Sequence, residues 1–430
     1  RRWPTPHLWL ATCAVVVASD PWALMQAGFW LSFVAIGVLF ATDLAVASDR
    51  RPSALGRLLG LLREQWVVTL ALAPLSLLLF QQVSLVGLLA NLLAIPWVTL
   101  VVTPLAMLGV AMPALWSLAA AAVEVMAWLL QALAHWPLAT LSTGAPPVWM
   151  AACGVAGGVL LAMRLPLSAR ALGLPLLLPV LLWQPPRPPA GEFDLLAADI
   201  GQGNAVLVRT AKHSLLYDTG PRYSLESDAG HRVLVPLLRA LDERLDTLVL
   251  SHRDADHTGG AAAVLAMQPQ AHLRSSIEAT HPLQALRPSI PCLQGQRWSW
   301  DGVAFEFLHP TSADYERATR PNAISCVLRV TNGRSSVLLA GDIEREQEAQ
   351  LAARAPALPT DLLLVPHHGS KTSSTAALLD AITPRIALVQ AGYRNRFGHP
   401  AEEVAQRYRE RGIALVDSAH CGALRWRSAS

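Results

Sequence analysis

The sequence predicts two parts of different fold class: a polytopic α-helical membrane domain followed by a soluble α/β domain. Of the 430 residues, 53% are hydrophobic and only 15% are charged. Residues 1–183 are poor in charged side chains, whereas the acidic and His-rich segments lie in 192–430. Between the two stands the Pro-rich stretch "WQPPRPPAGEF" at 183–193, which cannot continue a helix. The net charge of +3 is too small to indicate a nucleic-acid partner by itself.

These boundaries predict a transmembrane domain at 1–183, a linker at 184–192 and a soluble domain at 193–430. The first residues, "RRWPTPHLWLATCAVVVAS", have the charge and apolar run of a signal peptide. The chain has no initiator Met, however, and equally apolar segments follow. We therefore expect an N-terminally truncated fragment of a larger membrane protein rather than a cleaved leader.

Apolar windows suited to helices that cross a membrane fill the first part. A hydrocarbon core of ~30 Å needs about 20 apolar residues per helix. The windows lie at 8–19, 23–46, 65–81, 84–112, 114–136, 148–163 and 171–183. The longest one carries Pro96 and Pro104, so it is expected to be kinked or broken; we favour an ordinary kink in a packed bundle over a functional break.

Arginine placement predicts the orientation of this bundle. The segment 47–64 carries four arginines and 164–170 carries two, whereas the segments near 81–83 and 137–147 carry no Lys or Arg. By the positive-inside rule the first two segments are cytoplasmic. Counting the predicted spans then places the soluble domain on the outer, extracytoplasmic face of the cytoplasmic (inner) membrane. One span more or fewer reverses this result.

The second part alternates short apolar runs with helical patterns, which predicts a layered α/β architecture. Strands are expected within 193–210, 213–222, 247–260, 304–310, 325–342, 361–371 and 385–392. Helices are expected at 233–243, 260–267, 345–354, 374–382 and 400–412. The five cysteines contain no C-x-x-C pair, so a structural zinc site is not indicated. One disulfide among Cys292, Cys326 and Cys421 is allowed, but the sequence does not choose the pair.

A metal site is indicated by "SHRDADHTGG" at 251–260, which follows the buried strand expected at 247–250. His252, Asp254 and Asp256 alternate and are expected on one side of an extended segment, with His257 at the start of a helix. Histidine and aspartate are ligands for zinc, manganese and iron. A solvated polar loop with a helix cap is the alternative, but four such residues after one apolar strand favour a metal site.

The run resembles the H-x-H-x-D-H signature of the metallo-β-lactamase superfamily, whose members are metal-dependent hydrolases with a four-layer αββα fold. "LLYDTG" with Asp218, "VLLAGD" with Asp342 and "LLLVPHHGS" with His367 and His368 match in order. Together with "DIGQGNAVLV", "VPHHGSKTSS" and "RNRFGHP" they resemble the C-terminal domain of the ComEC family, the DNA-uptake channel of competent bacteria. The segments 20–39 and 91–105 resemble the competence domain of that family.

The sequence departs from the superfamily pattern at two ligand positions. Asp254 replaces the second histidine of H-x-H, and "RPNAISCVLRV" offers Asn322 and Ser325 where a third histidine is expected. A carboxylate-rich site shifts preference toward manganese or magnesium. We therefore expect one or two divalent ions, with Mn²⁺ favoured over Zn²⁺ or Mg²⁺.

The resemblance implies a division of the ligands between two metals. Asp256, His257 and Asp342 are expected to anchor one ion, with His368 or His399 added, and His252 and Asp254 to help hold a second. Which of His367 and His368 faces the site stays open, because neighbours on an extended chain point to opposite sides. Asp218 is expected to support the loop, and His309 to be structural.

Catalytic and substrate-binding roles follow from the same pattern. Asp256 is expected to bridge the metals or orient water, and His399 to protonate the leaving oxygen. Phosphate contacts are expected from the residues after "HHG" and in "RNRFGHP", namely Ser370, Lys371, Arg394 and Arg396. Solvated surface charge is the alternative for all four.

The function implied is DNA internalisation during natural transformation: a membrane channel passes single-stranded DNA, and a metal-dependent nuclease degrades the other strand. The expected partners are single- and double-stranded DNA, membrane lipid and other DNA-uptake machinery; a homo-oligomer is left open. Two alternatives stay open. One is a membrane-anchored hydrolase acting on a non-DNA ester or lipid phosphate, since one fold hosts many reactions. The other is a non-catalytic module that guides the strand.

Overall fold

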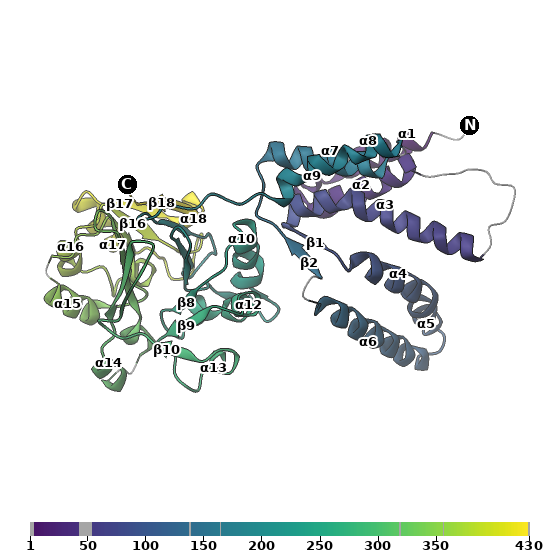
Figure 1. Ribbon diagram of the computed structural model, residues 1–430. Helices are drawn as coiled ribbons and strands as arrows, with labels where there is room; N and C mark the ends of the chain where they lie inside the picture. Colours follow the sequence, from purple (N-terminus) through teal and green to yellow (C-terminus); the bar gives the residue numbers. More distant parts are fainter. Residues whose placement is uncertain are drawn as a thin grey trace. The chain divides into compact units, whose positions relative to one another are not determined.

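The computed structural model describes residues 4–42, 54–136, 139–163, 165–317, 320–355 and 357–428 (Figure 1). The chain divides into two compact units, one made of Arg1–Pro185 with Arg239–Asp242 and the other of Pro186–Leu238 with Glu243–Ser430. Of the arginines used to orient the bundle, those at 50, 51 and 164 lie outside the described residues.

The first unit is helical, and most of its helices overlap the predicted apolar windows. They are α1 (Thr5–Ser19), η1 (Pro21–Met25), α2 (Ala27–Thr42), α3 (Ala54–Phe80), α4 (Gly87–Trp97), η2 (Val98–Val102), α5 (Thr103–Leu108), α6 (Ala114–Ala134), α7 (Val148–Ala162), α8 (Leu167–Ala171) and α9 (Gly173–Leu181). Helix also forms at 54–64 and 167–170, outside those windows. A short ribbon pairs β1 (Gln82–Ser84) with β2 (Thr140–Ser142). Within the described residues, the segments Gly87–Leu108 and Ala114–Ala134 are long and apolar enough to cross a membrane; five further apolar helices are shorter.

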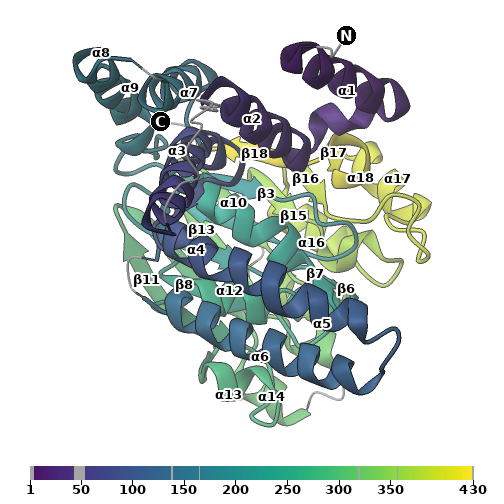
Figure 2. The same cartoon turned by 90° about the vertical axis from the view of Figure 1, so that its right-hand side faces the viewer.

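The segment with two prolines does not break. Between Pro96 and Pro104 the chain forms the π-helical turn η2, so α4, η2 and α5 are one continuous helical segment. A π turn lets the ladder continue past residues that lack an N–H donor. Figure 2 shows this segment beside α6, and the indole of Trp97 donates to the Ala122 carbonyl at 3.0 Å.

Glycines let the helices of this unit approach closely. A Cβ added to Gly157 of α7 would lie 2.7 Å from the carbonyl oxygen of Gly173 in α9. A Cβ added to Gly158 would lie 2.6 Å from the ring of Pro74 in α3. Such small-residue contacts are typical of helix packing in membranes.

The second unit contains two seven-stranded sheets. The first has the order β10 (Ser289–Pro291), β9 (His272–Ser275), β8 (Thr247–Leu250), β5 (Ser214–Tyr217), β4 (Val206–Arg209), β3 (Asp194–Ala197), β18 (Leu424–Arg427). The second has the order β11 (Arg297–Trp300), β12 (Val303–His309), β13 (Val327–Thr331), β14 (Ser336–Leu339), β15 (Leu362–Leu364), β16 (Ile386–Val389), β17 (Ala414–Asp417). In each sheet, four neighbouring strands are parallel and the others antiparallel.

The two sheets pack face to face, and helices cover their outer faces. One core joins Leu195, Val208 and Val249 of the first sheet to Phe305, Leu328 and other residues of the second. Against the outer face of the second sheet pack α15 (Arg345–Arg354), α16 (Ala376–Ile382) and α17 (Glu402–Glu410). Figure 1 shows these helices on one side of the sheets and α10 (Val235–Ala240) and α12 (Ala261–Met267) on the other. This is the four-layer αββα arrangement that was predicted.

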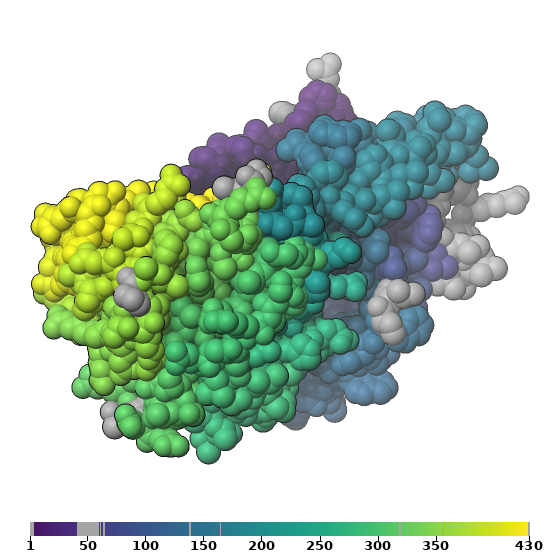
Figure 3. Space-filling view, turned by 60° about the vertical axis from the view of Figure 1, so that its left-hand side comes forward, coloured from purple at the N-terminus to yellow at the C-terminus, as the bar shows by residue number. Residues whose placement is uncertain are grey.

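The end of the chain completes both sheets. In Figure 3 its yellow segments lie against the green ones, and β17 pairs with β16 while β18 pairs with β3. The predicted runs contain the central strands, but β9, β10, β11, β17 and β18 were not predicted. They are outer strands or carry polar residues, so they lack the continuous apolar run that marks a central strand.

Smaller elements complete the unit. They are β6 (Arg222–Ser224), β7 (Ser227–Asp228), η3 (Gly230–Leu234), α11 (Ala255–Thr258), α13 (Leu283–Leu286), α14 (Ser312–Arg317), η4 (Pro321–Ile324), η5 (Pro366–Gly369) and α18 (Ser418–Cys421). A disulfide joins Cys292, just after β10, to Cys326, just before β13, and both cysteines are fully buried. Of the three cysteines that the sequence left open, Cys421 is therefore the free one, and it is exposed.

Candidate metal centre

Polar side chains meet at one edge of the sandwich, where parallel strands of both sheets end. From the first sheet come Asp218 after β5 and the motif 251–257 after β8. From the second come Asp342 after β14, His367 and His368 after β15, and Gln390 after β16. The carboxyl ends of parallel strands are the usual place for functional loops on an α/β scaffold.

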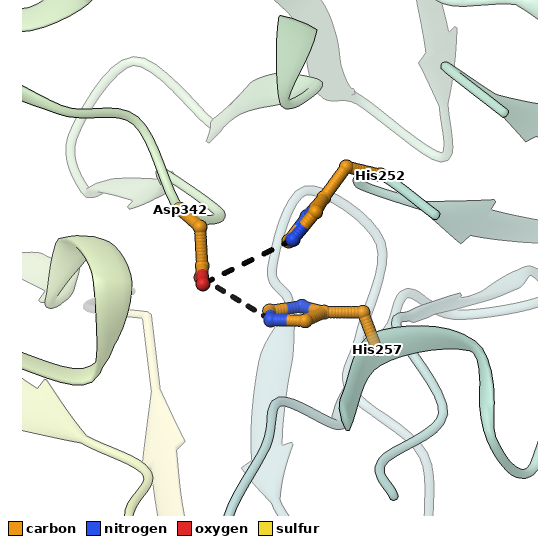
Figure 4. A group of neighbouring side chains, drawn as sticks. All are labelled: His252, His257 and Asp342. Atoms are coloured by element: carbon orange, nitrogen blue, oxygen red, sulfur yellow. Dashed lines mark ion pairs between the residues drawn. The ribbon is translucent and has the colours of Figure 1, made fainter. Parts of the chain in front are cut away.

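Two histidines of the first sheet face one aspartate of the second. His257 Nε2 lies 3.2 Å from Asp342 Oδ1, and His252 Nε2 lies 4.0 Å from Asp342 Oδ2. Figure 4 shows the three side chains pointing toward one another, the histidines from one side and the carboxylate from the other. All three are buried. One nitrogen or oxygen of each lies within 4.8 Å of the other two, which is a spacing that suits a metal ion.

A second group shares His257 with the first. Asp256 Oδ2 lies 3.3 Å from His368 Nε2, and His257 Nε2 lies 3.9 Å from Asp256 Oδ1. His368 is buried, whereas the Asp256 side chain is 31% exposed. His368 Nε2 also lies 3.6 Å from Asp342 Oδ2, so the two groups are contiguous. The structure thus places His252 beside His257 and Asp342, and Asp256 beside His368.

Unpaired buried atoms indicate that these residues fit a cation. His252 Nε2, His257 Nε2, His368 Nε2 and Asp342 Oδ1 are all buried without a hydrogen-bond partner. Each histidine nitrogen meets the Asp342 carboxylate only as an ion pair at 3.2–4.0 Å, without a hydrogen bond. Buried polar atoms are normally hydrogen-bonded, so four such atoms around one point are not expected in a merely structural cluster. Imidazole and carboxylate together suit a borderline divalent metal.

Asp218 and Ser251 hold the two histidines from behind. Asp218, fully buried, accepts from the amide of Ser251 at 2.6 Å, from the Ser251 hydroxyl at 2.8 Å and from His257 Nδ1 at 2.8 Å. The Ser251 hydroxyl also lies 3.0 Å from His252 Nδ1. A carboxylate behind a ligating imidazole fixes its tautomer and leaves Nε2 free for the metal. Asp218 therefore lies behind the site rather than in it.

The electrostatics follow from this mixture of buried charges. Burial would lower the pKa of His257, but the carboxylates of Asp342 and Asp218 raise it well above its ordinary value. Burial would raise the pKa of Asp342, but the charges of His257 and His368 lower it well below. The carboxylates thus stabilise positive charge at the centre, which is the charge a cation supplies.

The motif is not extended as predicted. Asp254 is the N-cap of the helical turn α11, which contains Asp256 and His257. Because the chain turns there, 252, 254 and 256 do not line one side of a strand, and that expectation was wrong. The Asp254 side chain is 44% exposed, and its Oδ2 lies 3.5 Å from His252 Nε2.

The backbone of η5 decides between the two adjacent histidines. His367 and His368 both adopt left-handed conformations, with φ of 50° and 54°. His368 is buried, and its Nδ1 lies 2.8 Å from the Gln390 carbonyl, which leaves Nε2 for the site. His367 is partly exposed; its Nε2 lies 3.8 Å from Asp342 Oδ2, and its Nδ1 lies 3.4 Å from Glu344 Oε1. Both therefore border Asp342, and His368 is the inner one.

Ser325 and Asn322, the two residues offered where a third histidine was expected, differ in their distance from the centre: Ser325 contacts His252 and Asp342, whereas Asn322 contacts Ser325. Ser325 is fully buried; its hydroxyl accepts from the Asp342 amide at 3.2 Å and lies 3.4 Å from His252 Nδ1. Asn322 lies in η4, and its carbonyl accepts from the Ser325 amide at 3.1 Å. His309 Nε2 lies 2.9 Å from the Ala323 carbonyl, away from the centre, as expected of a structural residue.

The remaining predicted residues lie around the centre. The His399 ring stacks near that of His368, with centroids 6.2 Å apart, and His399 Nδ1 is buried without a partner. Burial, aided by the positive charges of His368 and His367, lowers the pKa of His399 to about 4. Ser370 is buried and pairs with the Thr372 hydroxyl, whereas Lys371 is exposed.

Arg394 and Arg396 are exposed, and each lies over an aromatic ring that the sequence reasoning missed. Arg394 lies 5.3 Å from the ring centroid of Tyr393, and Arg396 lies 4.7 Å from that of Phe397. The signal was available, because in "YRNRF" at 393–397 two aromatic residues flank two arginines, shortly before His399. Ser251 and Gln390 were missed as supporting residues, since one serine or glutamine carries no metal signal by itself.

Comparison with known proteins matches both parts of the chain. Residues 1–167 match the family described as Competence protein, and residues 198–393 match the metallo-beta-lactamase superfamily. Competence protein ComA of Neisseria gonorrhoeae is 34% identical over 427 residues, covering 97% of this chain and 58% of that protein. Recombination protein 2 of Haemophilus influenzae is 30% identical, covering 94% and 56% respectively.

A third relative, the uncharacterized protein YcaI of Escherichia coli (strain K12), is 30% identical, covering 98% of this chain and 56% of that protein. The chain thus spans somewhat more than half the length of these relatives. The two family matches are separate, consecutive and in the order that the sequence predicts. The two parts of the chain therefore match, in this order, the Competence protein family and the metallo-β-lactamase superfamily, which confirms the resemblance seen in the sequence.

Proposed function

We propose that the second unit is a divalent-metal-dependent phosphodiesterase that hydrolyses DNA. We further propose that the whole chain serves DNA internalisation in natural transformation, with the first unit as part of a channel for single-stranded DNA. One observation carries the first proposal: unpaired buried atoms from both sheets, on His252, His257, His368 and Asp342, converge at one edge. The relatives named for competence and recombination support the second.

Two groups of residues would hold the metal. His252, His257 and Asp342 form one, and Asp256, His257 and His368 the other, with Asp254 beside the first. Mn²⁺ is proposed over Zn²⁺ or Mg²⁺, because nitrogen and carboxylate ligands are mixed and Asp254 adds an oxygen where a zinc hydrolase has nitrogen. When bound, a divalent ion supplies an acidified water and stabilises charge on a phosphodiester oxygen.

The chain's own residues orient the reactants. Asp256 belongs to the second ligand group and its side chain is 31% exposed, so in this proposal it accepts a hydrogen bond from an attacking water. With a pKa of about 4, His399 is neutral at pH 7, so its Nδ1 or Nε2 accepts a proton or a metal in that state. It delivers a proton to the leaving oxygen only after it has taken one up. Lys371, Arg394 and Arg396 are exposed cations suited to phosphate, with Ser370 beside Lys371.

We place the second unit on the extracytoplasmic side of the inner membrane. The buried disulfide between Cys292 and Cys326 supports this side, because such bonds persist in oxidising compartments. A C-terminal alkaline phosphatase fusion is expected to be active and a C-terminal green fluorescent protein fusion dark. The reverse pair of results would place this unit in the cytoplasm. Contacts with lipid, with other uptake machinery and with a second copy belong to the same proposal.

The test of the nuclease uses the whole chain purified in detergent with Mn²⁺, on single- and double-stranded DNA. His257→Gln is expected to lower the cleavage rate at least about 100-fold, since both ligand groups lose a member. The matched control, His272→Gln, removes an exposed imidazole from β9 and is expected to cleave like the wild type.

Other outcomes would contradict the proposal in distinct ways. Cleavage that persists in His257→Gln would show a contaminating nuclease. Hydrolysis of a lactone, thioester or lipid phosphate but not of DNA would indicate the alternative substrate class. DNA binding without hydrolysis, together with wild-type uptake by cells that carry His257→Gln, would indicate a module that only guides the strand.

A further inference from the structure

A groove opens beside the metal centre, on the side of Asp256. Its volume is about 540 Å³, within the range of ligand pockets, ~300–1,000 Å³. Asp256 and Ala255 of α11 line it, together with residues from separate segments of the chain. Those segments supply Gln202, Pro221, Arg222, Tyr393, Arg396 and Phe397.

Aromatic rings and cations lie together in and beside this groove. Tyr393 and Phe397 are 64% and 53% exposed, unusual for large apolar side chains on the same loop. The guanidinium groups of Arg394 and Arg396 lie over these rings, as described above. On the facing wall the Arg222 Nε donates to the Ser224 carbonyl at 3.0 Å, which holds this cation in place. The groove thus combines stacking faces with positive charge.

The rings continue from the groove into the metal centre. Phe397 lies 5.5 Å from His399 with the ring planes 21° apart, and His399 lies 6.2 Å from His368 with the planes 19° apart. His368 Nε2 in turn lies 3.3 Å from Asp256 Oδ2. A chain whose units stack on Phe397 would therefore reach the centre in the next step along its length.

Asn395 holds the loop in this shape before anything binds. Its side-chain amide donates to the carbonyls of Gly392 and His399 at 3.0 and 2.6 Å, and its Oδ1 accepts from the His399 amide at 2.9 Å. Gln202 on the opposite wall accepts from the Gly392 amide at 3.3 Å. Exposed rings on a preorganised loop lose little conformational freedom on binding, which favours a ligand site over a solvated loop.

We propose that this groove is a subsite for single-stranded nucleic acid, in which Tyr393 and Phe397 stack bases. Arg222 and Arg396 in the groove, with Arg394 beside it, hold the backbone phosphates. Unpaired bases stack on aromatic rings and on guanidinium planes without regard to sequence, while a duplex keeps its base faces covered. The inference deepens the proposed function, because it names the strand state that enters the metal centre from this side.

The test measures binding apart from hydrolysis. The whole chain in detergent with EDTA is titrated against a fluorescein-labelled strand of about twelve deoxythymidines, within the ~4–16-nucleotide range of single-strand sites. Phe397→Leu and Tyr393→Leu, made together, are expected to weaken binding at least about 5-fold for each ring removed. Phe397→Trp keeps a stacking ring and is expected to bind like the wild type. An abasic strand of equal length is expected to bind the wild type and the Leu variant alike.

Arginine variants separate backbone contact from stacking. Each phosphate contact contributes about 0.7 to the slope of log affinity against log salt for single strands. Arg394→Ala with Arg396→Ala is therefore expected to flatten that slope by about 1.4. The matched control, Arg334→Ala with Arg385→Ala, removes two exposed arginines at the opposite ends of the strands and is expected to leave the slope unchanged.

The outcomes for the groove and for the nuclease are independent. Equal binding of the wild type and the Leu variant, or equal binding of duplex and single strand, would overturn the groove proposal even if Mn²⁺-dependent cleavage is found. Loss of affinity in the Leu variant without any cleavage by the wild type would uphold the groove and overturn the nuclease. All rings in question are exposed, so an unchanged thermal unfolding midpoint is the check that the variants fold.

Discussion

At the scale of single residues, Asp218 shows how the fold prepares a metal ligand. It has a left-handed backbone, with φ of 60°, and accepts three hydrogen bonds that hold Ser251 and His257. Asn tolerates this backbone conformation and matches the shape of Asp. An amide has one accepting oxygen and no charge, however, so Asn cannot accept all three hydrogen bonds as the Asp218 carboxylate does. The substitution therefore isolates the orienting role of this carboxylate.

We predict that Asp218→Asn weakens metal binding about 10- to 100-fold while the chain stays folded, because His257 loses its orienting partner. Titration calorimetry of the whole chain with Mn²⁺ measures this. The matched control is Asp361→Asn, since Asp361 accepts from the Ser336 amide at 2.9 Å, away from the metal centre. Equal Mn²⁺ affinity of Asp218→Asn and Asp361→Asn would contradict the orienting role.

Candidate site residues could be identified from the sequence where they lie together in one motif. The motif at 252–257 drew attention through its place after an apolar strand, and the resemblance added Asp342 and the supporting place of Asp218; the structure brings these side chains together. The inner position of His368 was not predictable, because it depends on two consecutive left-handed residues in η5. A left-handed non-glycine residue is held by its surroundings and leaves no pattern in the sequence.

At the scale of elements, the turn between β11 and β12 of the second sheet is hydrogen-bonded to the turn between β4 and β5 of the first. Asp301, at the hairpin turn, accepts from the Thr210 hydroxyl and the Lys212 amide at 2.7 Å each and lies 3.2 Å from His213 Nδ1. The rings of His213 and Trp300 stack 5.1 Å apart. The partial burial of Asp301, whose side chain is 12% exposed, would raise its pKa, but these hydrogen bonds lower it to about 2.

A carboxyl whose pKa is lowered in the folded state stabilises that state above its unfolded pKa of ~3.9, and this contribution disappears as the pH falls toward 2. We predict that Asp301→Asn lowers the unfolding free energy by about 1–2 kcal/mol at pH 6–7 and has little effect near pH 2. Denaturant titrations at a series of pH values test this. A destabilisation that is constant down to pH 2 would mean that packing, and not the charge, is lost.

Buried strands and helices were easier to predict from the sequence than exposed ones. The central strands and α15 follow from apolar runs and helical periodicity, whereas the outer strands β11, β17 and β18 alternate polar residues and were missed. The glycine pair at 259–260 closes the metal motif in the sequence. Its role in the structure is close backbone packing, since a Cβ on Gly259 would lie 2.2 Å from the Arg222 amide nitrogen. Such a role depends on a segment distant in sequence.

At the scale of the whole molecule, the metal centre lies where the two sheets of the second unit join. Each ligand group takes residues from both sheets, His252 and His257 from the first, Asp342 and His368 from the second. Contacts that need no metal also cross the junction. The Tyr217 hydroxyl donates to the Cys326 carbonyl at 2.6 Å, and the Gln390 amide donates to the Ala198 carbonyl at 2.7 Å. The sandwich is therefore expected to stay folded without metal and to gain stability with it.

This gain can be predicted in size. A ligand at 100 times its dissociation constant stabilises the folded state by about 2.7 kcal/mol. In a unit of 150–250 residues each kcal/mol shifts the unfolding midpoint by about 2–4 °C, so excess Mn²⁺ is expected to raise the midpoint by about 5–10 °C over EDTA. Scanning fluorimetry of the whole chain in detergent measures the shift. Asp342→Asn should abolish it, since the one carboxylate of the first ligand group is lost. Asp301→Asn should lower the unfolding midpoint but keep the increase caused by Mn²⁺, because the contacts of Asp301 with the β4–β5 turn lie away from the metal centre. A shift that persists in Asp342→Asn would mean that the ion binds elsewhere and that the two sheets are not coupled through this site.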